Sequence, residues 1–271
     1  MKKIIFLFLV LVSFINADKL DDKLYSFIGE KEYKIHKNLL NHLFKKRDQF
    51  IYNDKINYKE VLRVLHENGL LHLQFNQPKV LKIKFNINES HLKTLKILND
   101  TLKSMGYYYY FTKETIKDEN NTLTWTIEFK TRYAIDPLIF IKKLLAHDTR
   151  VTDIIKYSDN NWEYSLDTSK ANISEAVFIE LNEKKKFSKP LNDYFIKVKD
   201  ASKIRIISRT LNHWFPYIVF YDEHLNVLKT IKKDAIHRYL RSPIPKGTVY
   251  IKVSDLYMLL NIKRGLSIIV N

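Results

Sequence analysis

The sequence predicts an α+β protein with three regions behind an N-terminal export signal. Apolar residues recur at helical spacing up to about residue 78. Alternating apolar runs and helix caps then follow in β-α-β-β-α-β order, and beyond residue 166 short strands replace helical periodicity. We therefore expect a signal peptide (1–17), a helical lead-in (18–78), an α+β module (79–166) and a C-terminal antiparallel β-sandwich of jelly-roll type (167–271).

The first residues have the pattern of a secretory signal peptide. Lys2 and Lys3 precede an apolar run, and the small residue Ala17 ends the polar stretch that follows it, which predicts cleavage after Ala17. The run is shorter than the roughly 20 apolar residues of a spanning helix, so a retained anchor is the weaker alternative. Because the chain has no Cys, lipid attachment is excluded. We expect a periplasmic protein.

The helical lead-in is predicted to contain two amphipathic helices. The second begins where Asn57 stands three residues before Glu60 in a capping-box arrangement, and it ends at Gly69. A short strand over 71–75 follows, and Pro78 marks the boundary with the next region.

The α+β module has the clearest order of elements. Asp136-Pro137 opens its second helix, because the Asp side chain can accept from free N–H groups and Pro fits the first helical position. The predicted elements are strand 81–87, helix 92–105, strands 107–116 and 123–129, helix 137–145 and the hairpin 151–157 with 162–166.

This order matches the ferredoxin-like split βαβ motif. The module resembles the small periplasmic ferredoxin-like modules of secretion, pilus and envelope assemblies. The resemblance implies a role in protein docking.

The C-terminal region is predicted to contain eight short strands. These cover 177–181, 194–198, 204–208, 217–221, 227–231, 236–240, 249–253 and 266–270. The fragments Ile218–Asp222 and Pro245–Val253, the latter with Gly247-Thr248 opening a late strand, resemble bacterial pre-peptidase C-terminal and carbohydrate-binding-like sandwiches.

The composition excludes several kinds of chemistry. Without Cys there is no thiolate catalysis, Cys-ligated zinc or disulfide, and none of the 5 Gly falls in a phosphate-binding loop. The 9 His lack metal-binding spacing, and Asp222-Glu223-His224 has the composition of a turn. No catalytic motif is present, so we expect a non-enzymatic protein without cofactors or metals; a site assembled from distant residues is an open alternative.

Positive charge is concentrated near the C-terminus. Of the formal net charge of +16, residues 167–271 carry 19 basic and 10 acidic groups, a net +9. This distribution favours an anionic partner such as lipopolysaccharide, a glycan or an anionic membrane. Lys enrichment from an AT-rich genome is the alternative explanation. Export argues against nucleic acid as a partner.

A group of aromatic and basic residues is the predicted ligand or partner surface. It comprises Trp214, Tyr217, Arg205, Arg209, Lys184, Lys185, Lys186, Arg238 and Arg241. Packing of Trp214 between sheets and solvated loop lysines are the alternatives. The run Tyr107–Tyr110 is predicted to be a strand with rings on alternate faces, which would leave some of them exposed for stacking.

Asn120 lies in an extended acceptor pattern for bacterial N-glycosylation, with Asp118 two residues before it and Thr122 two residues after. The signal peptide and the Lys, Ile and Asn richness resemble exported proteins of Campylobacter-like bacteria, and this resemblance implies a glycan on Asn120.

The expected function is that of a periplasmic scaffold or accessory protein of a cell-envelope assembly, acting by protein docking. The alternative is a glycan- or anionic-surface-binding protein that uses the basic aromatic face of the sandwich.

Overall fold

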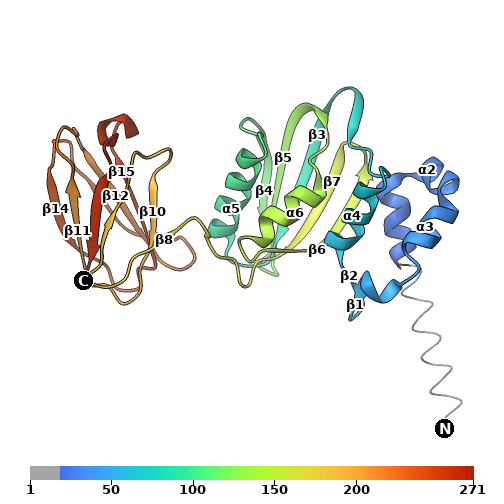
Figure 1. Cartoon of the computed structure of the whole chain (residues 1–271), viewed down its shortest axis with the longest axis horizontal. Helices are drawn as coiled ribbons and strands as arrows, with labels where there is room; N and C mark the ends of the chain where they lie inside the picture. The colour runs from blue at the N-terminus through green and yellow to red at the C-terminus, as the bar shows by residue number, and fades with distance from the viewer. Residues whose placement is uncertain (1–18) are drawn as a thin grey trace, which may run out of the picture. The chain divides into compact units, whose positions relative to one another are not determined.

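The structure is a computed structural model that describes residues 19–271, in two compact units (Figure 1). The N-terminal unit ends at Asn172, and the C-terminal unit covers Ile173–Asn271. The fold is mixed α/β with more strand than helix. The predicted signal peptide and its cleavage site at Ala17 lie outside the described residues. Within 19–271, no helix has the length and apolar character needed to cross a membrane.

The N-terminal unit begins with short helices. Residues 19–28 are helical, and α2 (Glu30–Ile35), α3 (Lys37–Leu43), η1 (Arg47–Gln49), β1 (Ile51–Tyr52), β2 (Lys55–Ile56) and α4 (Tyr58–Glu67) follow. The predicted cap of α4 is confirmed, since the Asn57 side chain accepts from the Glu60 N–H at 3.4 Å. Gly69, at a φ of 66°, follows the end of the helix as predicted.

A five-stranded sheet with two helices completes this unit. Its elements are β3 (Gln74–Ile87), α5 (His91–Ser104), β4 (Phe111–Lys117), β5 (Leu123–Tyr133), α6 (Pro137–Leu145), β6 (Arg150–Ser158) and β7 (Asn161–Asp167), in strand order β4-β5-β3-β7-β6. Strand β7 pairs in parallel with β3 and separates it from β6. The β-α-β-β-α-β motif has four strands, whereas the predicted elements include five because the last strand was expected as a hairpin, and all five are present in the sheet.

The structure differs from the sequence prediction at the start of β3 and agrees with it at the start of α6. Of the predicted strand over 71–75, only Gln74 and Phe75 are in a strand, as the start of β3, and β3 runs on through Pro78, where a boundary was expected. Its register against β5 shifts between Gln74 and Lys79, which accommodates a proline that cannot donate a ladder hydrogen bond. The cap at Asp136 is confirmed: its carboxylate accepts from the Leu138 and Ile139 N–H groups at 2.9 and 3.1 Å.

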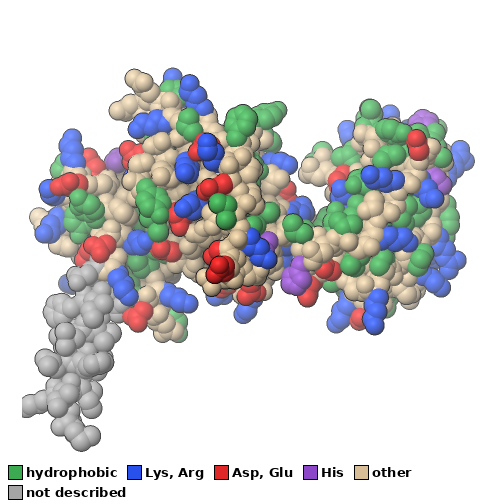
Figure 2. All heavy atoms as spheres, turned by 180° about the vertical axis from the view of Figure 1, so that it is seen from behind, with side chains coloured by type: hydrophobic (Ala, Val, Ile, Leu, Met, Phe, Trp, Pro, Cys, Tyr) green, Lys and Arg blue, Asp and Glu red, His purple; other side chains and the backbone are tan. Residues whose placement is uncertain are grey.

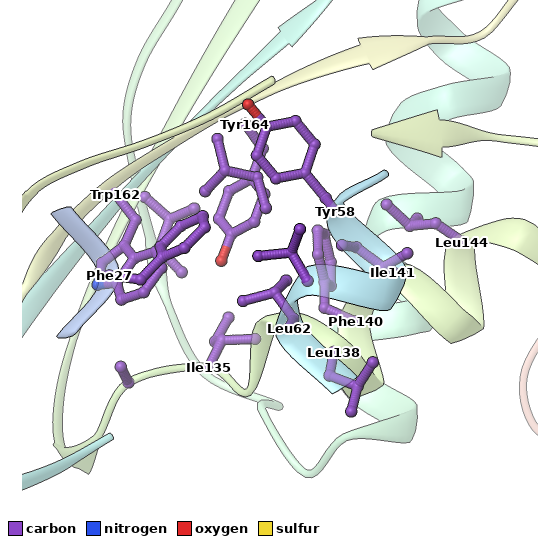
Figure 3. Close-up of a cluster of buried hydrophobic side chains, with 14 of the residues drawn as sticks. Phe27, Tyr58, Leu62, Ile135, Leu138, Phe140, Ile141, Leu144, Trp162 and Tyr164 are labelled. Carbon is purple, nitrogen blue, oxygen red and sulfur yellow. The ribbon is translucent and has the colours of Figure 1, made fainter. Parts of the chain in front are cut away.

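One hydrophobic core joins the lead-in to the sheet (Figure 3). Phe27 of the first helix stacks on Trp162 of β7, with ring centroids 6.3 Å apart and planes 14° apart. Tyr164 lies beside Trp162, and its ring packs against that of Phe140 of α6, with the ring centroids 5.2 Å apart. The sequence-based division between residues 78 and 79 therefore falls inside a single core.

The C-terminal unit consists of two sheets. Its elements are β8 (Val177–Phe178), β9 (Lys184–Lys186), β10 (Tyr194–Lys197), β11 (Lys203–Ser208), β12 (Pro216–Tyr221), β13 (Val227–Lys232), β14 (Tyr239–Pro243), β15 (Tyr250–Asp255), η2 (Leu259–Ile262) and β16 (Leu266–Val270). The strand orders are β13-β12-β15-β10-β8 and β14-β11-β16-β9. Apolar side chains of both sheets form one core. The β8–β10 pair is parallel, so the expected all-antiparallel pairing is wrong at this edge.

Candidate binding surface

Trp214 does not belong to the surface. Its side chain is 0% exposed within the core of the C-terminal unit, and its Nε1–H donates to the Ser254 carbonyl oxygen at 2.9 Å. The prediction that Trp214 is a ligand-contacting residue is therefore corrected: burial with a satisfied indole N–H is a packing role.

Strand register brings several predicted cations onto one sheet face. Arg205 of β11 lies opposite Arg241 of β14, and on its other side it lies opposite Ile269 of β16, which in turn faces Lys184 of β9. Directly paired residues of antiparallel strands project to the same face. Since Ile204 and Ile206 on either side of Arg205 are buried, this row lies on the outer face of the sheet.

Two further cations complete what we call the basic face, defined as Lys184, Lys186, Lys203, Arg205 and Arg241. Lys203 precedes Arg205 by two residues, and Lys186 follows Lys184 by two, so both share the outer face. The four strands contain no Asp or Glu. Within residues 19–271, no salt bridge involves any of these five side chains.

The pair Arg205 and Arg241 is electrostatically unfavourable by itself. Cβ atoms of directly opposed cross-strand residues are about 4.5–5.5 Å apart, and like charges at this spacing destabilise a sheet. Moreover, the Arg205 Nε–H is shielded from solvent and has no hydrogen-bond partner among the described residues. An anion bound over this row would relieve the repulsion between the two guanidinium groups.

The other predicted surface residues do not join this face. Lys185 projects to the opposite side of β9 and pairs with Glu183 at 3.3 Å. Tyr217 lies on β12 of the other sheet, with the Lys252 Nζ 4.7 Å from its ring centre. Arg209 and Arg238 are exposed just beyond the ends of β11 and β14. The single predicted patch is thus divided between two sheets.

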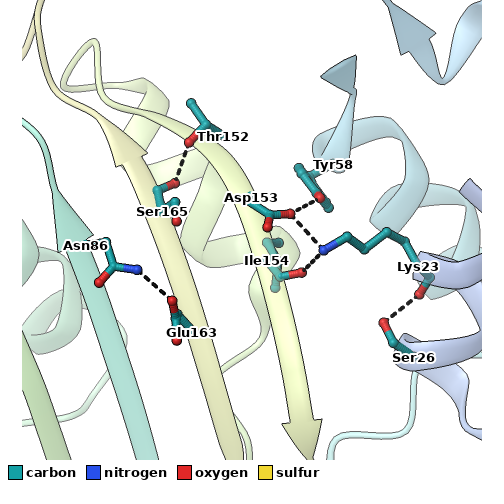
Figure 4. A network of polar contacts seen from close by, with 9 residues as sticks. All are labelled: Lys23, Ser26, Tyr58, Asn86, Thr152, Asp153, Ile154, Glu163 and Ser165. Carbon is teal, nitrogen blue, oxygen red and sulfur yellow. Dashed lines mark hydrogen bonds and ion pairs between the residues drawn. The ribbon is translucent and has the colours of Figure 1, made fainter. Parts of the chain in front are cut away.

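The outer face of the N-terminal sheet is polar but internally paired (Figure 4). The Glu163 carboxylate accepts from Asn86 at 2.7 Å and from Tyr157 at 2.9 Å, and it pairs with Lys84 at 3.2 Å. Burial disfavours the ionised form, yet these three partners hold the pKa of Glu163 below its ordinary value. The two units therefore differ: Glu163 neutralises Lys84 on this sheet, whereas the four strands that carry the basic face contain no carboxylate.

Lys and Arg side chains are more widespread than Asp and Glu over the C-terminal unit in the space-filling view (Figure 2). This agrees with the sequence, in which residues 167–271 carry the largest net charge.

The tyrosine run is not a strand. Residues 107–110 precede β4, with Tyr107 packed on Phe129 at 5.1 Å and Tyr110 edge-on to Trp125 at 5.8 Å. Tyr108 and Tyr109 are 64% and 91% exposed. The prediction of alternate exposure is therefore wrong, because residues three apart, and not two apart, face inward.

No constellation suited to metal binding is present in residues 19–271: three or more His, Asp or Glu side chains nowhere converge. Asp222 belongs to a turn, as its composition suggested, since its Oδ1 accepts from the His224 and Asn226 N–H groups. Asn120 is exposed in the turn between β4 and β5, which is compatible with the predicted modification.

Comparisons with known proteins add nothing to this geometry: no protein-family model matches the chain, and neither a curated protein nor a solved structure matches it.

Proposed function

We propose that this chain is a non-catalytic binding protein of the cell envelope that holds an anionic partner on the basic face of its C-terminal unit. The observation that supports this proposal is the row Lys184–Ile269–Arg205–Arg241, which has no carboxylate on its four strands. The likeness of the two units to ferredoxin-like docking modules and to carbohydrate-binding-like sandwiches belongs to the same proposal.

A broad, open face with unpaired cations suits a repeating anion better than a single small ligand. Each basic residue close to a charged surface adds about 1 kcal/mol of attraction, and salt screens this attraction within a Debye length of about 8 Å at physiological ionic strength. Binding should therefore be reversible and should weaken as salt is added.

The test compares two double variants with equal loss of charge. Lys184→Gln/Arg241→Gln removes two cations from the basic face, and Lys113→Gln/Lys117→Gln removes two exposed cations from β4 of the N-terminal unit. Binding to purified lipopolysaccharide and to peptidoglycan is measured by sedimentation. We expect about 30-fold weaker binding in the first variant only.

Equal loss in both variants would mean that only net charge matters, and the proposal would be wrong. The proposal would also be wrong if the unchanged protein bound neither lipopolysaccharide nor peptidoglycan.

Protein docking at the free edge of β4 is a second candidate. The edge strand begins at Phe111, which is 81% exposed and follows the 91% exposed Tyr109. Such an edge can accept an extended segment of another chain. A photoreactive residue at Phe111 should capture one defined envelope protein in cells, and the same residue at Tyr52, which is 76% exposed, should not. Identical capture at both positions would contradict this candidate.

A further inference from the structure

A cationic cleft of about 550 Å³ lies between the edge strands β13 and β14 of the two sheets in the C-terminal unit. Its lining includes Lys229, Lys232, Lys233, His237, Tyr239 and Arg241. Each of these strands is the last of its sheet on this side, so the cleft is where the shared core opens to solvent.

Strand register gives the cleft an apolar floor and a cationic rim. Ile231 lies opposite Ile218 on β12, and Leu240 lies opposite Ile206 on β11; these partners are buried in the core, so Ile231 and Leu240 face inward. Lys229 projects to the same side as Ile231, one pair further along the strand.

The rim residues come from the outer sides of the strands. Lys232 lies opposite Tyr217, with its Nζ 5.4 Å from the centre of that ring, and Arg241 lies opposite Arg205, both on outer faces. The cations therefore approach the cleft from different directions, which distinguishes it from a row on one flat face.

No carboxylate neutralises these cations within the described part of the chain. Asp and Glu are absent from the lining, and no salt bridge involves Lys229, Lys232, Lys233 or Arg241. Asp234 follows Lys233 in the chain, but its carboxylate accepts a hydrogen bond from the Tyr257 hydroxyl.

We propose that this cleft binds a phosphate group. Four cations around one concavity exceed what a single carboxylate neutralises, whereas a phosphate ester supplies up to two charges and several acceptor oxygens. Arg241 offers the planar donor pair that matches two phosphate oxygens, and the lysines act as point charges. The inference rests on the proposed function in one respect: Arg241 belongs to both the cleft and the basic face.

The experiment uses the full chain and two double variants that share no residue. Lys229→Gln/Lys232→Gln changes the cleft alone, and Lys184→Gln/Lys203→Gln changes the basic face alone. Calorimetric titration with pyrophosphate measures the cleft, and thermal unfolding verifies that both variants are folded. We expect the cleft variant to lose about tenfold or more in affinity, while the basic-face variant stays within about twofold of the unchanged protein. Lys229→Arg/Lys232→Arg, which keeps the charges, should retain binding.

Vesicles of phosphatidylcholine, with and without phosphatidylglycerol, distinguish the source of the phosphate. Vesicle binding that depends on the cleft residues identifies a lipid headgroup, and pyrophosphate binding without it identifies a soluble phosphate ester; both outcomes support the site.

The inference is overturned if pyrophosphate does not bind, or if both variants weaken its binding equally. If lipopolysaccharide binding still depends on Lys184 and Arg241 in that case, the proposed function stands and only the cleft is excluded.

Discussion

Asp153→Asn should loosen the attachment of the first helix to the sheet of the N-terminal unit. The Asp153 carboxylate on β6 accepts hydrogen bonds from the Lys23 ammonium, at 2.8 Å, and from the Tyr58 hydroxyl (Figure 4). Lys23 also donates to the Ile154 carbonyl oxygen at 2.8 Å. Residues from the helix at 19–28, from α4 and from β6 thus meet at one carboxylate.

The expected loss of stability follows from the number of hydrogen bonds to Asp153 and from the solvent exposure of the side chains that make them. A hydrogen bond to a charged group contributes about 1.5–3 kcal/mol, and two are weakened here. The side chains of Lys23 and Asp153 are 23% and 41% exposed, so solvent screening reduces this sum. We expect Asp153→Asn to lower the free energy of unfolding of the N-terminal unit by about 2–3 kcal/mol.

The contribution of this carboxylate should depend on pH in a defined direction. Burial raises the pKa of Asp153, but the hydrogen bonds from Lys23 and Tyr58 and the Lys23 charge outweigh it, so the pKa lies below its ordinary 3.8. Because the folded-state pKa is depressed, the ionised carboxylate stabilises the fold above pH 3.8. This stabilisation is lost as the pH falls through the folded-state pKa. The difference between Asp153→Asn and the unchanged protein should therefore be full at neutral pH and vanish in strong acid.

Hydrogen exchange followed by mass spectrometry measures each unit separately in the full chain. Asp100→Asn is the matched control, because it makes the same substitution in the partly exposed Lys96–Asp100 pair of α5. Asp153→Asn should accelerate exchange in residues 19–28 and in β6, and Asp100→Asn should leave both unchanged. Equal effects of the two variants, or a loss in Asp153→Asn that persists at low pH, would refute the reasoning.

Further predictions concern the C-terminal unit. Gly247 and Gly265 share a φ of 84°, but an added Cβ at Gly265 would lie 1.9 Å from the Phe187 carbonyl oxygen, whereas Gly247 has open space. Gly247→Ala should cost about 1–2 kcal/mol, and Gly265→Ala should unfold the unit at clearly lower denaturant; similar midpoints would contradict this. Trp214→Ala should cost about 3–5 kcal/mol in chemical unfolding. The milder Trp214→Phe should keep lipopolysaccharide affinity unchanged. A selective loss of affinity would mean that Trp214 contacts the ligand.

Local signals in the sequence predicted local structure well. Asn57 and Asp136 start helices because their side chains accept from nearby N–H groups, and this chemistry requires no knowledge of the rest of the fold. The final strand, β16, has the predicted bounds of Leu266 and Val270, where a short apolar run follows the turn residue Gly265. By contrast, the sequence has no local marker for the insertion of β7 between β3 and β6, which depends on long-range pairing.

The basic face could be predicted only in part. Lys184, Lys186, Arg205 and Arg241 belong to the surface that the sequence predicts, but their alignment depends on register between strands that are distant in sequence. Lys203 was missed because it lies outside any run of charge. The strand β9 was also missed: three successive lysines show no alternation, and they form a strand only because β16 provides a partner. Only the register between these strands, which the structure provides, shows that the cations share one face.

The parallel pairing of β3 with β7 has a consequence for folding kinetics. The Asn160 side chain contacts the Val80 carbonyl oxygen across 80 residues of chain, and Lys23 reaches Asp153 across 130. Closing such long loops costs entropy before any contact compensates for it, so we expect slow folding of this unit. Because synthesis starts at the N-terminus, β3 is made before β7, and one edge of β3 stays unpaired until β7 has been made. During that interval it is exposed to pairing with other chains, which gives a holding chaperone a physical reason to act.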